Sequence, residues 1–409
     1  MNIEKFWAQS LSMIKSLMGA VLRSSERILT THTGSLPRPP ELSLLHIARS
    51  KNQSADSEAL REVGKRAVQE VVTQQIAAHI DIGNDGEQQR DSFLLHVLQR
   101  LSGFGGQWNR EPFADLTKYP DYMEAEKKRL ASSASISVRQ NLPKAISAIQ
   151  YLGSQFISRE CTVLADAVIQ NPGLKGCFVT SPSPGTIAAC MKNEFYSSDD
   201  EYISALGSAL TQEYVAIVDH GFMLQIDCPE LALERHVGFQ KKGLPDFLRF
   251  GEKVMAALND SIRTIPRDQT RLHVCWGNYE GPHDEDIPLE AILDILCSAN
   301  VGTFVLPLAN PRHAHEYRLL PRLLGDDRTI VAGVIDTTTN YIEHPAVVAD
   351  RICKVAETIG DPTRVIAGTD CGFETVTGAS RIAPSVAWAK LTSLAEGAQL
   401  ASKRLFSKI

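Results

Sequence analysis

The chain has 409 residues, of which 43% are hydrophobic and 22% are charged, and its formal net charge at pH 7 is −6. These values are ordinary for a globular protein, and the length suits one large α/β barrel with insertions as well as two domains. The sequence contains no basic run and no basic stripe interleaved with aromatic residues, which argues against nucleic acid as a partner and favours small molecules.

The N-terminal residues 1–26 are predicted to form an amphipathic helical extension, suited to subunit contact in a homo-oligomer. Lys5 and Lys15 interrupt its apolar residues and no clear cleavage site follows, so the segment fits neither a membrane span nor a secretory signal. Eight cysteines are spread along the chain without a dense framework, which indicates reduced thiols and a cytoplasmic protein.

From residue 27 onward, strand patterns alternate with helix patterns. Residues 27–39 are predicted to form a strand that leads into a polar loop ended by glycine and prolines, followed by a helix over 57–79. The later strands are expected at 80–87, 176–181, 222–227, 272–277, 302–308, 329–336 and 364–369, and the later helices at 198–220, 244–265, 289–299, 312–324, 345–359 and in a long C-terminal segment. Residues 91–170 are less regular and are predicted to be an excursion that covers the site.

Eight strands that alternate with helices predict a single (β/α)8 TIM barrel over residues 27–409, with an insertion after the second strand. A doubly wound open sheet is the alternative. It is disfavoured because no G-x-G-x-x-G opens a helix after the first strand and no P-loop is present. In a barrel, the carboxyl ends of the strands form one face, where active sites are built.

Polar residues gather at the predicted carboxyl ends: His32, Ser35, Asp85, Glu87, Asp227, His273, Cys275, Asn310, Asp336, Asp370 and Cys371. His273 and Cys275 lie two residues apart on one strand, so their side chains share a face. Together with Cys371 they form a donor set that suits Zn²⁺, with one coordination position left open. The alternative is that all three are buried core residues.

Glu87 and Asp227 would bring two carboxylates to the same face, an arrangement that fits recognition of an ammonium group; the alternative is a solvated rim. Arg312 offers a cation for an anionic group. His313 and His315 are expected to begin a helix, where residues two apart do not face each other, so they are not predicted as a ligand pair. Trp276 is predicted to be a core residue.

Five motifs in order carry a resemblance to a known family: Thr33-Gly34-Ser35, Asp85-Gly86-Glu87 with Arg90, Gln225-Ile226-Asp227-Cys228-Pro229, His273-Val274-Cys275 and Asp370-Cys371-Gly372. The chain resembles the catalytic-barrel half of cobalamin-independent methionine synthase and its single-barrel relatives, which include the epoxyalkane:coenzyme M transferases. The wider superfamily also contains uroporphyrinogen decarboxylase.

The resemblance implies roles for these residues. Gly34 and Ser35 would bind the carboxylate of homocysteine, and Glu87 and Asp227 its amino group. His273, Cys275 and Cys371 would bind Zn²⁺. Two positions depart from the family pattern. Pro307 stands where the family has a fourth ligand, a glutamate, so we expect either three protein ligands with substrate or water as the fourth, which we favour, or substitution by His313. Cys228 replaces a glutamate and is either a spectator or a second thiol.

The predicted function is zinc-dependent transfer of an alkyl group, most simply methyl, from a donor to a small thiol such as homocysteine. The metal would activate the thiol as a thiolate. A corrinoid carrier protein is a candidate donor partner. The alternatives are a lyase or decarboxylase on the same barrel, alkyl transfer to coenzyme M or another thiol, and a non-catalytic zinc protein.

Overall fold

The structure, a computed structural model, describes residues 22–51, 57–131 and 135–406. Most of the predicted N-terminal extension, residues 1–21, therefore lies outside the described residues. Among the described residues, no helix has the length and apolar character needed to cross a membrane.

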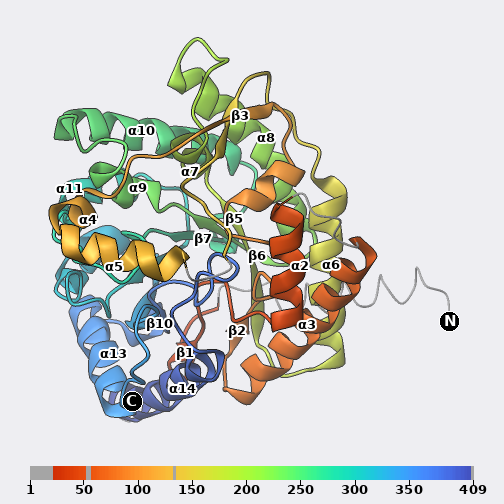
Figure 1. The fold of residues 1–409 in the computed structure, drawn as a ribbon. Coiled ribbons are helices and arrows are strands. Elements are labelled where there is room, and N and C mark those ends of the chain that lie inside the picture. The colour runs from red at the N-terminus through yellow and green to blue at the C-terminus, as the bar shows by residue number, and fades with distance from the viewer. Residues whose placement is uncertain (1–21, 52–56, 132–134, 407–409) are drawn as a thin grey trace.

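Eight parallel strands form one sheet in the order β1-β10-β9-β8-β7-β6-β5-β2 (Figure 1). A parallel bridge between Thr31 and Ile82 joins the two ends of this sheet, so the strands close into a barrel. The strands are β1 (Leu29–Thr30), β2 (Ile82–Gly83), β5 (Gly176–Pro182), β6 (Met223–Asp227), β7 (Thr270–His273), β8 (Thr303–Pro307), β9 (Thr329–Ile335) and β10 (Val365–Thr369). The predicted (β/α)8 barrel is confirmed, and the open sheet is excluded.

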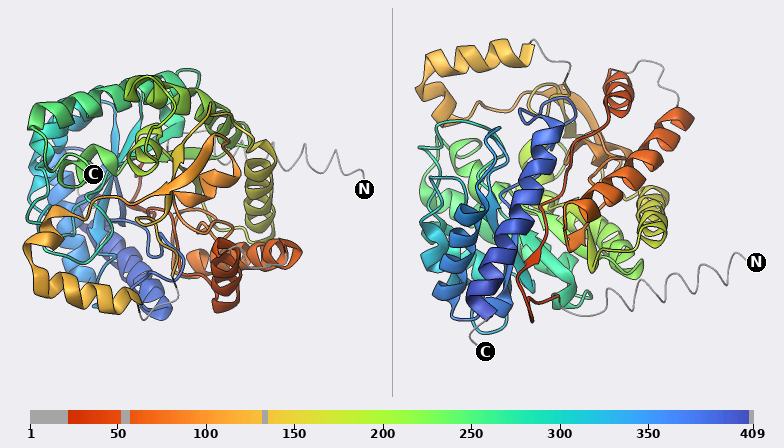
Figure 2. Two further views of the ribbon diagram at one scale, coloured as in Figure 1. Left: turned by 45° about the horizontal axis from the view of Figure 1, so that its top comes forward. Right: turned by 90° about the horizontal axis from the view of Figure 1, so that it is seen from below.

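Helices surround the barrel and follow the strands in sequence (Figure 2). They are α2 (Pro40–Ser50), α3 (Ser57–Ala77), α6 (Ser154–Gln170), α7 (Pro184–Cys190), α8 (Asp199–Asp219), α9 (Glu230–Leu233), α10 (Leu244–Ser261), α11 (Leu289–Cys297), α12 (Leu320–Leu324), α13 (Pro345–Ile359) and α14 (Pro384–Phe406). Local sequence explains several boundaries. Ser198 caps α8 by accepting a hydrogen bond from the Glu201 amide, and Gly360 ends α13 in a left-handed conformation with φ +78°.

The predicted helix over 312–324 is wrong in its first half. Residues 311–315 form turns, Glu316–Leu319 form a 3₁₀ helix, and α12 begins only at Leu320. Pro321 lies in the first turn of α12, where its missing amide hydrogen is tolerated, and it could not occupy the interior of a longer helix. The predicted strand over 272–277 also ends earlier, at His273.

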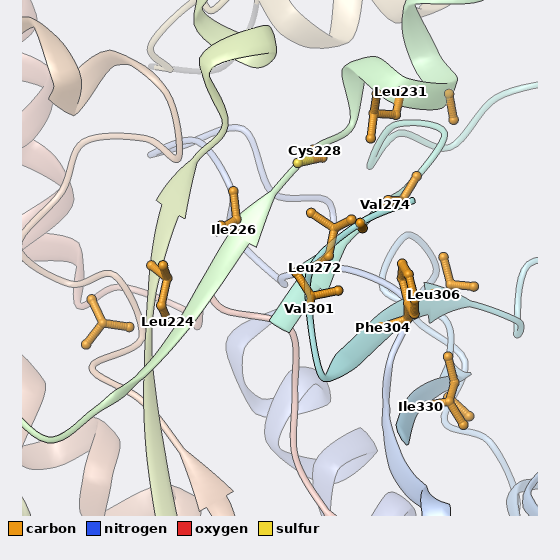
Figure 3. Close-up of a cluster of buried hydrophobic side chains, with 14 of the residues drawn as sticks. Leu224, Ile226, Cys228, Leu231, Leu272, Val274, Val301, Phe304, Leu306 and Ile330 are labelled. Carbon is orange, nitrogen blue, oxygen red and sulfur yellow. The ribbon is translucent and has the colours of Figure 1, made fainter. Parts of the chain in front are cut away.

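Alternation along the strands separates two environments. Figure 3 shows Leu224, Ile226 and Cys228 of the β6 segment beside Leu272, Val274, Phe304 and Leu306 of the next two strands, in one cluster of buried apolar side chains. The intervening positions, such as Asp227 and His273, line the cavity at the barrel mouth instead. Cys228 therefore packs in the core, which makes it a spectator rather than a second thiol at the site.

A smaller apolar layer fills the barrel interior, and it consists of Leu29, Ile82, Phe178, Val305, Val331 and Ile366. The guanidinium of Arg271 lies 4.0 Å from the centre of the Phe178 ring and is fully buried. The barrel is thus closed below the site, as in other barrels of this type, and an open cavity remains at the carboxyl ends of the strands.

Residues 91–153 leave the helical ring after β2. They include an antiparallel pair, β3 (Phe104–Trp108) with β4 (Leu142–Ala145), and two helices, α4 (Ala114–Lys118) and α5 (Pro120–Ala131). Helix α6 then returns to the ring and packs against α3 and α8. Figure 2 shows α4 and α5 at one end of the barrel, and side chains of both helices line the same cavity as the strand ends.

Candidate functional site

A cavity of about 290 Å³ opens at the carboxyl ends of the strands. Its floor is made by residues that directly follow or end β1, β2, β6, β7 and β10, and its roof by Leu116 of α4 and Glu126, Arg129 and Leu130 of α5. Seven of the eight predicted site residues lie at or beside this floor, namely Gly34, Ser35, Glu87, Asp227, His273, Cys275 and Cys371.

The predicted metal trio converges at this floor. His273 ends β7, Cys275 follows two residues later, and Cys371 lies two residues beyond the end of β10. The Cys371 Sγ atom is 3.7 Å from His273 Nε2, and the donor atoms of the three residues lie within 4.8 Å of one another. All three side chains are buried. Two segments almost a hundred residues apart therefore place one nitrogen and two sulfur donors around one point.

The surroundings orient these donors. His273 Nδ1 lies 3.2 Å from the main-chain oxygen of Val305, and donation to this carbonyl leaves Nε2 directed towards the sulfur atoms. The carboxylate of Asp370 accepts hydrogen bonds from the amides of Leu308, Ala309 and Asn310 at 2.8–3.0 Å. Asp370 thereby ties the Cys371 turn to the loop that follows β8.

The two thiols are unequal. A hydrogen bond from Cys371, together with the nearby His273, lowers the pKa of Cys275 well below the usual thiol value despite burial. The same hydrogen bond and burial raise the pKa of Cys371. Cysteine binds metals as the thiolate. The lowered pKa of Cys275 therefore favours the form of its sulfur that binds a soft cation.

Pro307, where the sequence resemblance led us to expect a fourth ligand, ends β8 and lines a small cavity next to Cys275 and Cys371. Its ring carries no donor atom. Both ring nitrogens of His313 are engaged elsewhere, Nε2 with Asp286 Oδ2 at 2.8 Å and Nδ1 with Glu316 Oε2 at 3.0 Å. The geometry therefore favours a trio with an open fourth position over substitution by His313.

Two buried carboxylates lie beside the trio. Thr180 donates a hydrogen bond to Glu87 Oε1 at 3.0 Å, and Gln225 donates one to Asp227 Oδ1 at 2.9 Å. Glu87 Oε2 has no hydrogen-bond partner within the described part of the chain. Burial raises the pKa of Asp227 to about 6, and burial together with the charge of Asp227 raises the pKa of Glu87 to about 7. The negative charge of these two carboxylates is not balanced by enough hydrogen bonds and cations, and a cation such as an ammonium group would stabilise it.

The loop after β1 contacts these groups closely. Gly34 has φ +143°, and a Cβ atom at this position would lie 2.7 Å from Glu87 Oε1. Ser35 Oγ is buried and, among the described residues, has no hydrogen-bond partner. Gly372, next to Cys371, leaves space for this hydroxyl, since a Cβ atom there would lie 2.2 Å from it. The two glycines thus permit a close approach of the loop to both the carboxylates and the trio.

Arg312 is not brought to the site. It is exposed, its Nε donates to the main-chain oxygen of His283 at 3.1 Å, and it does not line the cavity. His32 also points elsewhere, since Nε2 contacts Gln75 Oε1 at 2.8 Å and Nδ1 accepts a bond from the Gly34 amide. Burial lowers the pKa of His32 to about 4, so it is a neutral support of the loop.

Two buried arginines support the floor from one layer away: Arg90, which the sequence motif includes without a role, and Arg271, which sequence reasoning missed. Arg90 binds Glu160 at 2.8 Å and the main-chain oxygen and hydroxyl of Thr180, which in turn holds Glu87. Arg271 is a buried cation below Asp227, and burial lowers its pKa to about 9. The sequence could have predicted that Arg271 points into the barrel. It lies two residues before His273 on the same strand, so both side chains point to the same side.

The chain was compared with known proteins and solved structures. No family model matches it. A methionine synthase from Saccharolobus solfataricus is 25% identical over 382 residues, covering 93% of this chain and 96% of that protein, and one from Sulfolobus acidocaldarius is 27% identical over 383 residues, covering 93% and 94%.

Among solved structures, a B12-independent methionine synthase from Shewanella sp. W3-18-1, in complex with selenomethionine, superposes with a TM-score of 0.67 at 19% identity, over 93% of this chain and 99% of that one. A second, from Listeria monocytogenes, gives 0.60 at 18%, over 91% and 98%. These structures share the fold, and the two sequence relatives match 93% of this chain. The chain is thus similar over more than nine tenths of its length to proteins named methionine synthase, and it has the fold of two B12-independent methionine synthase structures.

Proposed function

We propose that the protein is a zinc-dependent methyltransferase whose acceptor is a small amino-acid thiol, with homocysteine as the leading candidate. The observation that carries the proposal is the convergence of His273, Cys275 and Cys371 within 4.8 Å, at the floor of a cavity that also exposes Glu87 and Asp227. Relatives that match more than nine tenths of the chain are named methionine synthase, which supports the same activity.

The donor set fits Zn²⁺ by its chemistry. Two cysteine sulfurs and one imidazole nitrogen are typical zinc ligands, and three protein ligands beside a cavity correspond to a catalytic rather than a closed structural site. His273, Cys275 and Cys371 would hold the ion. Bound there, zinc supplies a Lewis acid that lowers the pKa of a thiol placed in its open position.

The remaining residues would hold the acceptor. Glu87 and Asp227 form the part of the floor that suits an ammonium group. The Ser35 hydroxyl, which has no hydrogen-bond partner in the part of the chain that the structure describes, can donate to a carboxylate beside it. The apolar side chains of Leu116 and Leu130 close the cavity from above and reduce the access of water. The acceptor would then lie between the strand ends and α4–α5, with its sulfur towards the cysteines.

The transfer itself needs no oxidant or reductant. The acceptor thiol gives its proton to water, and its sulfur uses an electron pair to form a bond to the methyl carbon while the bond between that carbon and the donor breaks. The donor leaves with the electron pair of the broken bond. Activity measurements with different methylated compounds would identify the methyl donor, and a corrinoid carrier protein is one candidate.

The alternatives fit the floor less well. Coenzyme M carries a sulfonate and no amine, so it would leave Glu87 and Asp227 unpaired in a buried site, which is costly. A decarboxylase acting on a polycarboxylate needs cations at the reacting end of the substrate, whereas Glu87 and Asp227 lie at this floor. The arginines that also line the cavity do not come from the ends of the barrel strands; they are Arg110, Arg129, Arg139 and Arg381. A non-catalytic zinc site is normally closed by four protein ligands.

The proposal is tested by a thiol-dependent activity screen over methylated donors, with and without a corrinoid carrier, on protein of measured zinc content. We expect methylation of homocysteine that is lost when zinc is removed by a chelator and regained when zinc is added. Turnover that is indifferent to zinc, or a preference for coenzyme M over homocysteine, would contradict it.

A further inference from the structure

A second cluster of histidines and carboxylates lies on the loops that follow β7 and β8. His283 and Asp286 belong to the segment between β7 and α11, and His313 belongs to the turn after β8. His283 Nδ1 and His313 Nε2 both lie 2.8 Å from Asp286 Oδ2, and one donor atom from each of the three residues lies within 4.8 Å of the others. This cluster contains no sulfur and is separate from the trio of His273, Cys275 and Cys371.

The outer nitrogen of each imidazole is already fixed. His313 Nδ1 is 3.0 Å from Glu316 Oε2, and His283 Nε2 is 3.0 Å from the main-chain oxygen of Tyr279. Glu316 is itself held, because its other oxygen accepts the amide of Leu289 at 2.6 Å. Histidines that bind metals typically donate their second nitrogen to a carboxylate or a main-chain carbonyl in this way, which directs the remaining lone pair at the ion.

Unpartnered polar atoms point to the same place. His236 is 2% exposed, and neither of its ring nitrogens has a hydrogen-bond partner within the described residues. Its Nε2 lies 3.6 Å from Asp286 Oδ1, which likewise lacks a hydrogen-bond partner there. A buried imidazole and a buried carboxylate oxygen that face each other without a hydrogen bond indicate a group between them.

Aromatic rings close the sides of the cluster. The Trp276 ring stacks on His313 with centroids 3.8 Å apart, and Phe113 stacks on His236 at 5.6 Å. A purely hydrogen-bonded network would satisfy His283 and His313 through one oxygen of Asp286, yet it would leave His236 and the other oxygen unsatisfied. A cation at the centre would engage His283, Asp286 and His313 together with Nε2 of His236, whose Nδ1 faces Asp115 Oδ1 at 3.8 Å.

We propose that His283, Asp286 and His313 bind a divalent transition-metal ion, with His236 as a fourth ligand. Three imidazoles and one carboxylate suit Zn²⁺ and its neighbours in the first transition series. The inference is independent of the proposed methyl transfer, because this site would be closed by protein ligands and would stabilise the structure.

The position suggests what the ion would hold together. It would join the loop after β7 to the turn after β8. The loop after β7 also carries Asn278, whose side chain donates to the main-chain oxygen of Gly372 at 2.8 Å, next to Cys371. The second ion would thus hold in place a loop that contacts the first site.

Titration of the metal-free full-length protein with Co²⁺ tests the proposal. We expect saturation at two equivalents per chain: one with the intense near-ultraviolet absorption of thiolate-to-metal charge transfer, and one with weak visible bands only. Cys275→Ser should abolish the charge-transfer absorption while one equivalent still binds. His283→Gln and Asp286→Asn should each lose one equivalent and keep the charge-transfer absorption.

His315→Gln is the matched control, because His315 is an exposed histidine in the same turn as His313, and it should bind two equivalents. Circular dichroism checks that each variant is folded. If His283→Gln does not fold, two measurements still test whether the second ion binds: the number of Co²⁺ equivalents bound by the isosteric Asp286→Asn, and the number bound by Cys275→Ser. Saturation of the wild type at one equivalent, no binding by Cys275→Ser, or two equivalents in Asp286→Asn would overturn the proposal and leave a hydrogen-bonded network.

Discussion

Gly34 lies so close to Glu87 that a Cβ atom at position 34 would come within 2.7 Å of Glu87 Oε1. Gly34 also has φ +143°, a conformation that residues with a side chain rarely adopt. The loop that carries Ser35 can therefore approach the carboxylate only because position 34 has no side chain. This contact links the first and second strands at the floor of the cavity.

Gly34→Ala should raise the KM for homocysteine, because the added methyl group displaces either Glu87 or the Ser35 loop. Zinc content should remain unchanged, since neither residue belongs to the trio. Steady-state kinetics with metal analysis of the same preparation measures both quantities. An unchanged KM would contradict a role for this contact in acceptor binding.

Cys275→Ser and Cys371→Ser should each lose bound zinc. Removing one ligand from a site with three protein ligands is expected to weaken the free energy of metal binding by several kcal/mol. Metal analysis after dialysis measures the loss. Cys297→Ser is the control, because Cys297 is partly exposed and does not line the cavity, and it should retain the wild-type zinc content. Stoichiometric zinc in the double variant Cys275→Ser/Cys371→Ser would contradict the ligand assignment.

The barrel could be predicted because each strand and most helices have a strong local pattern. Strand β9, for example, carries an apolar run from Ile330 to Ile335, is followed by the polar Asp336, and is buried at every position. Trp276 was also predicted correctly as a core residue. The convergence of His273 and Cys371 followed from topology, since the carboxyl ends of all barrel strands lie on one face.

The second cluster could not be predicted in the same way. The sequence predicts that His313 begins a helix, but it lies in the turn at 311–315, which allows it to face Asp286. The approach of His236, Asp286 and His313 depends on a short 3₁₀ helix, Glu234–His236, and on two loop segments that have no periodicity. Loop conformation of this kind is determined by tertiary contacts rather than by local preference.

The raised pKa of Glu87 predicts a pH-dependent loss of stability. Burial and the charge of Asp227 raise the pKa of Glu87 from about 4.5 to about 7, while Arg90, Arg38 and Asp85 are the other charged groups that act on it. Between these two pH values the unfolded chain releases the proton and the folded protein retains it, so the free energy of unfolding falls as pH rises from about 4.5 to about 7 and is then constant.

Urea denaturation of metal-free protein measures this effect. Glutamine does not titrate, so Glu87→Gln lacks this loss of stability. The free energy of unfolding of the variant minus that of the wild type should therefore increase from pH 5 to pH 8, by an amount on the order of 2–3 kcal/mol. Equal pH dependence in the two proteins would mean that Glu87 has an ordinary pKa in the folded state.

The choice of acceptor should depend on Asp227. Its carboxylate is buried at the cavity floor beside Glu87, where it would pair with the ammonium group of homocysteine. Asp227→Asn removes the charge but keeps the shape and the contact with Gln225. It should therefore raise the KM for homocysteine by a factor equivalent to about 1.5–3 kcal/mol of binding free energy, the range for hydrogen bonds to charged groups. Zinc content should stay unchanged.

The same variant distinguishes acceptor recognition from a general defect at the site. A thiol without an amino group cannot use Asp227, so its turnover by Asp227→Asn should equal its turnover by the wild type, and the preference for homocysteine over such a thiol should shrink. Competition between homocysteine and a plain alkyl thiol in one reaction measures this preference directly. If the wild type accepts both thiols equally and Asp227→Asn behaves like the wild type, the carboxylates serve another group, and the ammonium of the acceptor is not what this cavity recognises.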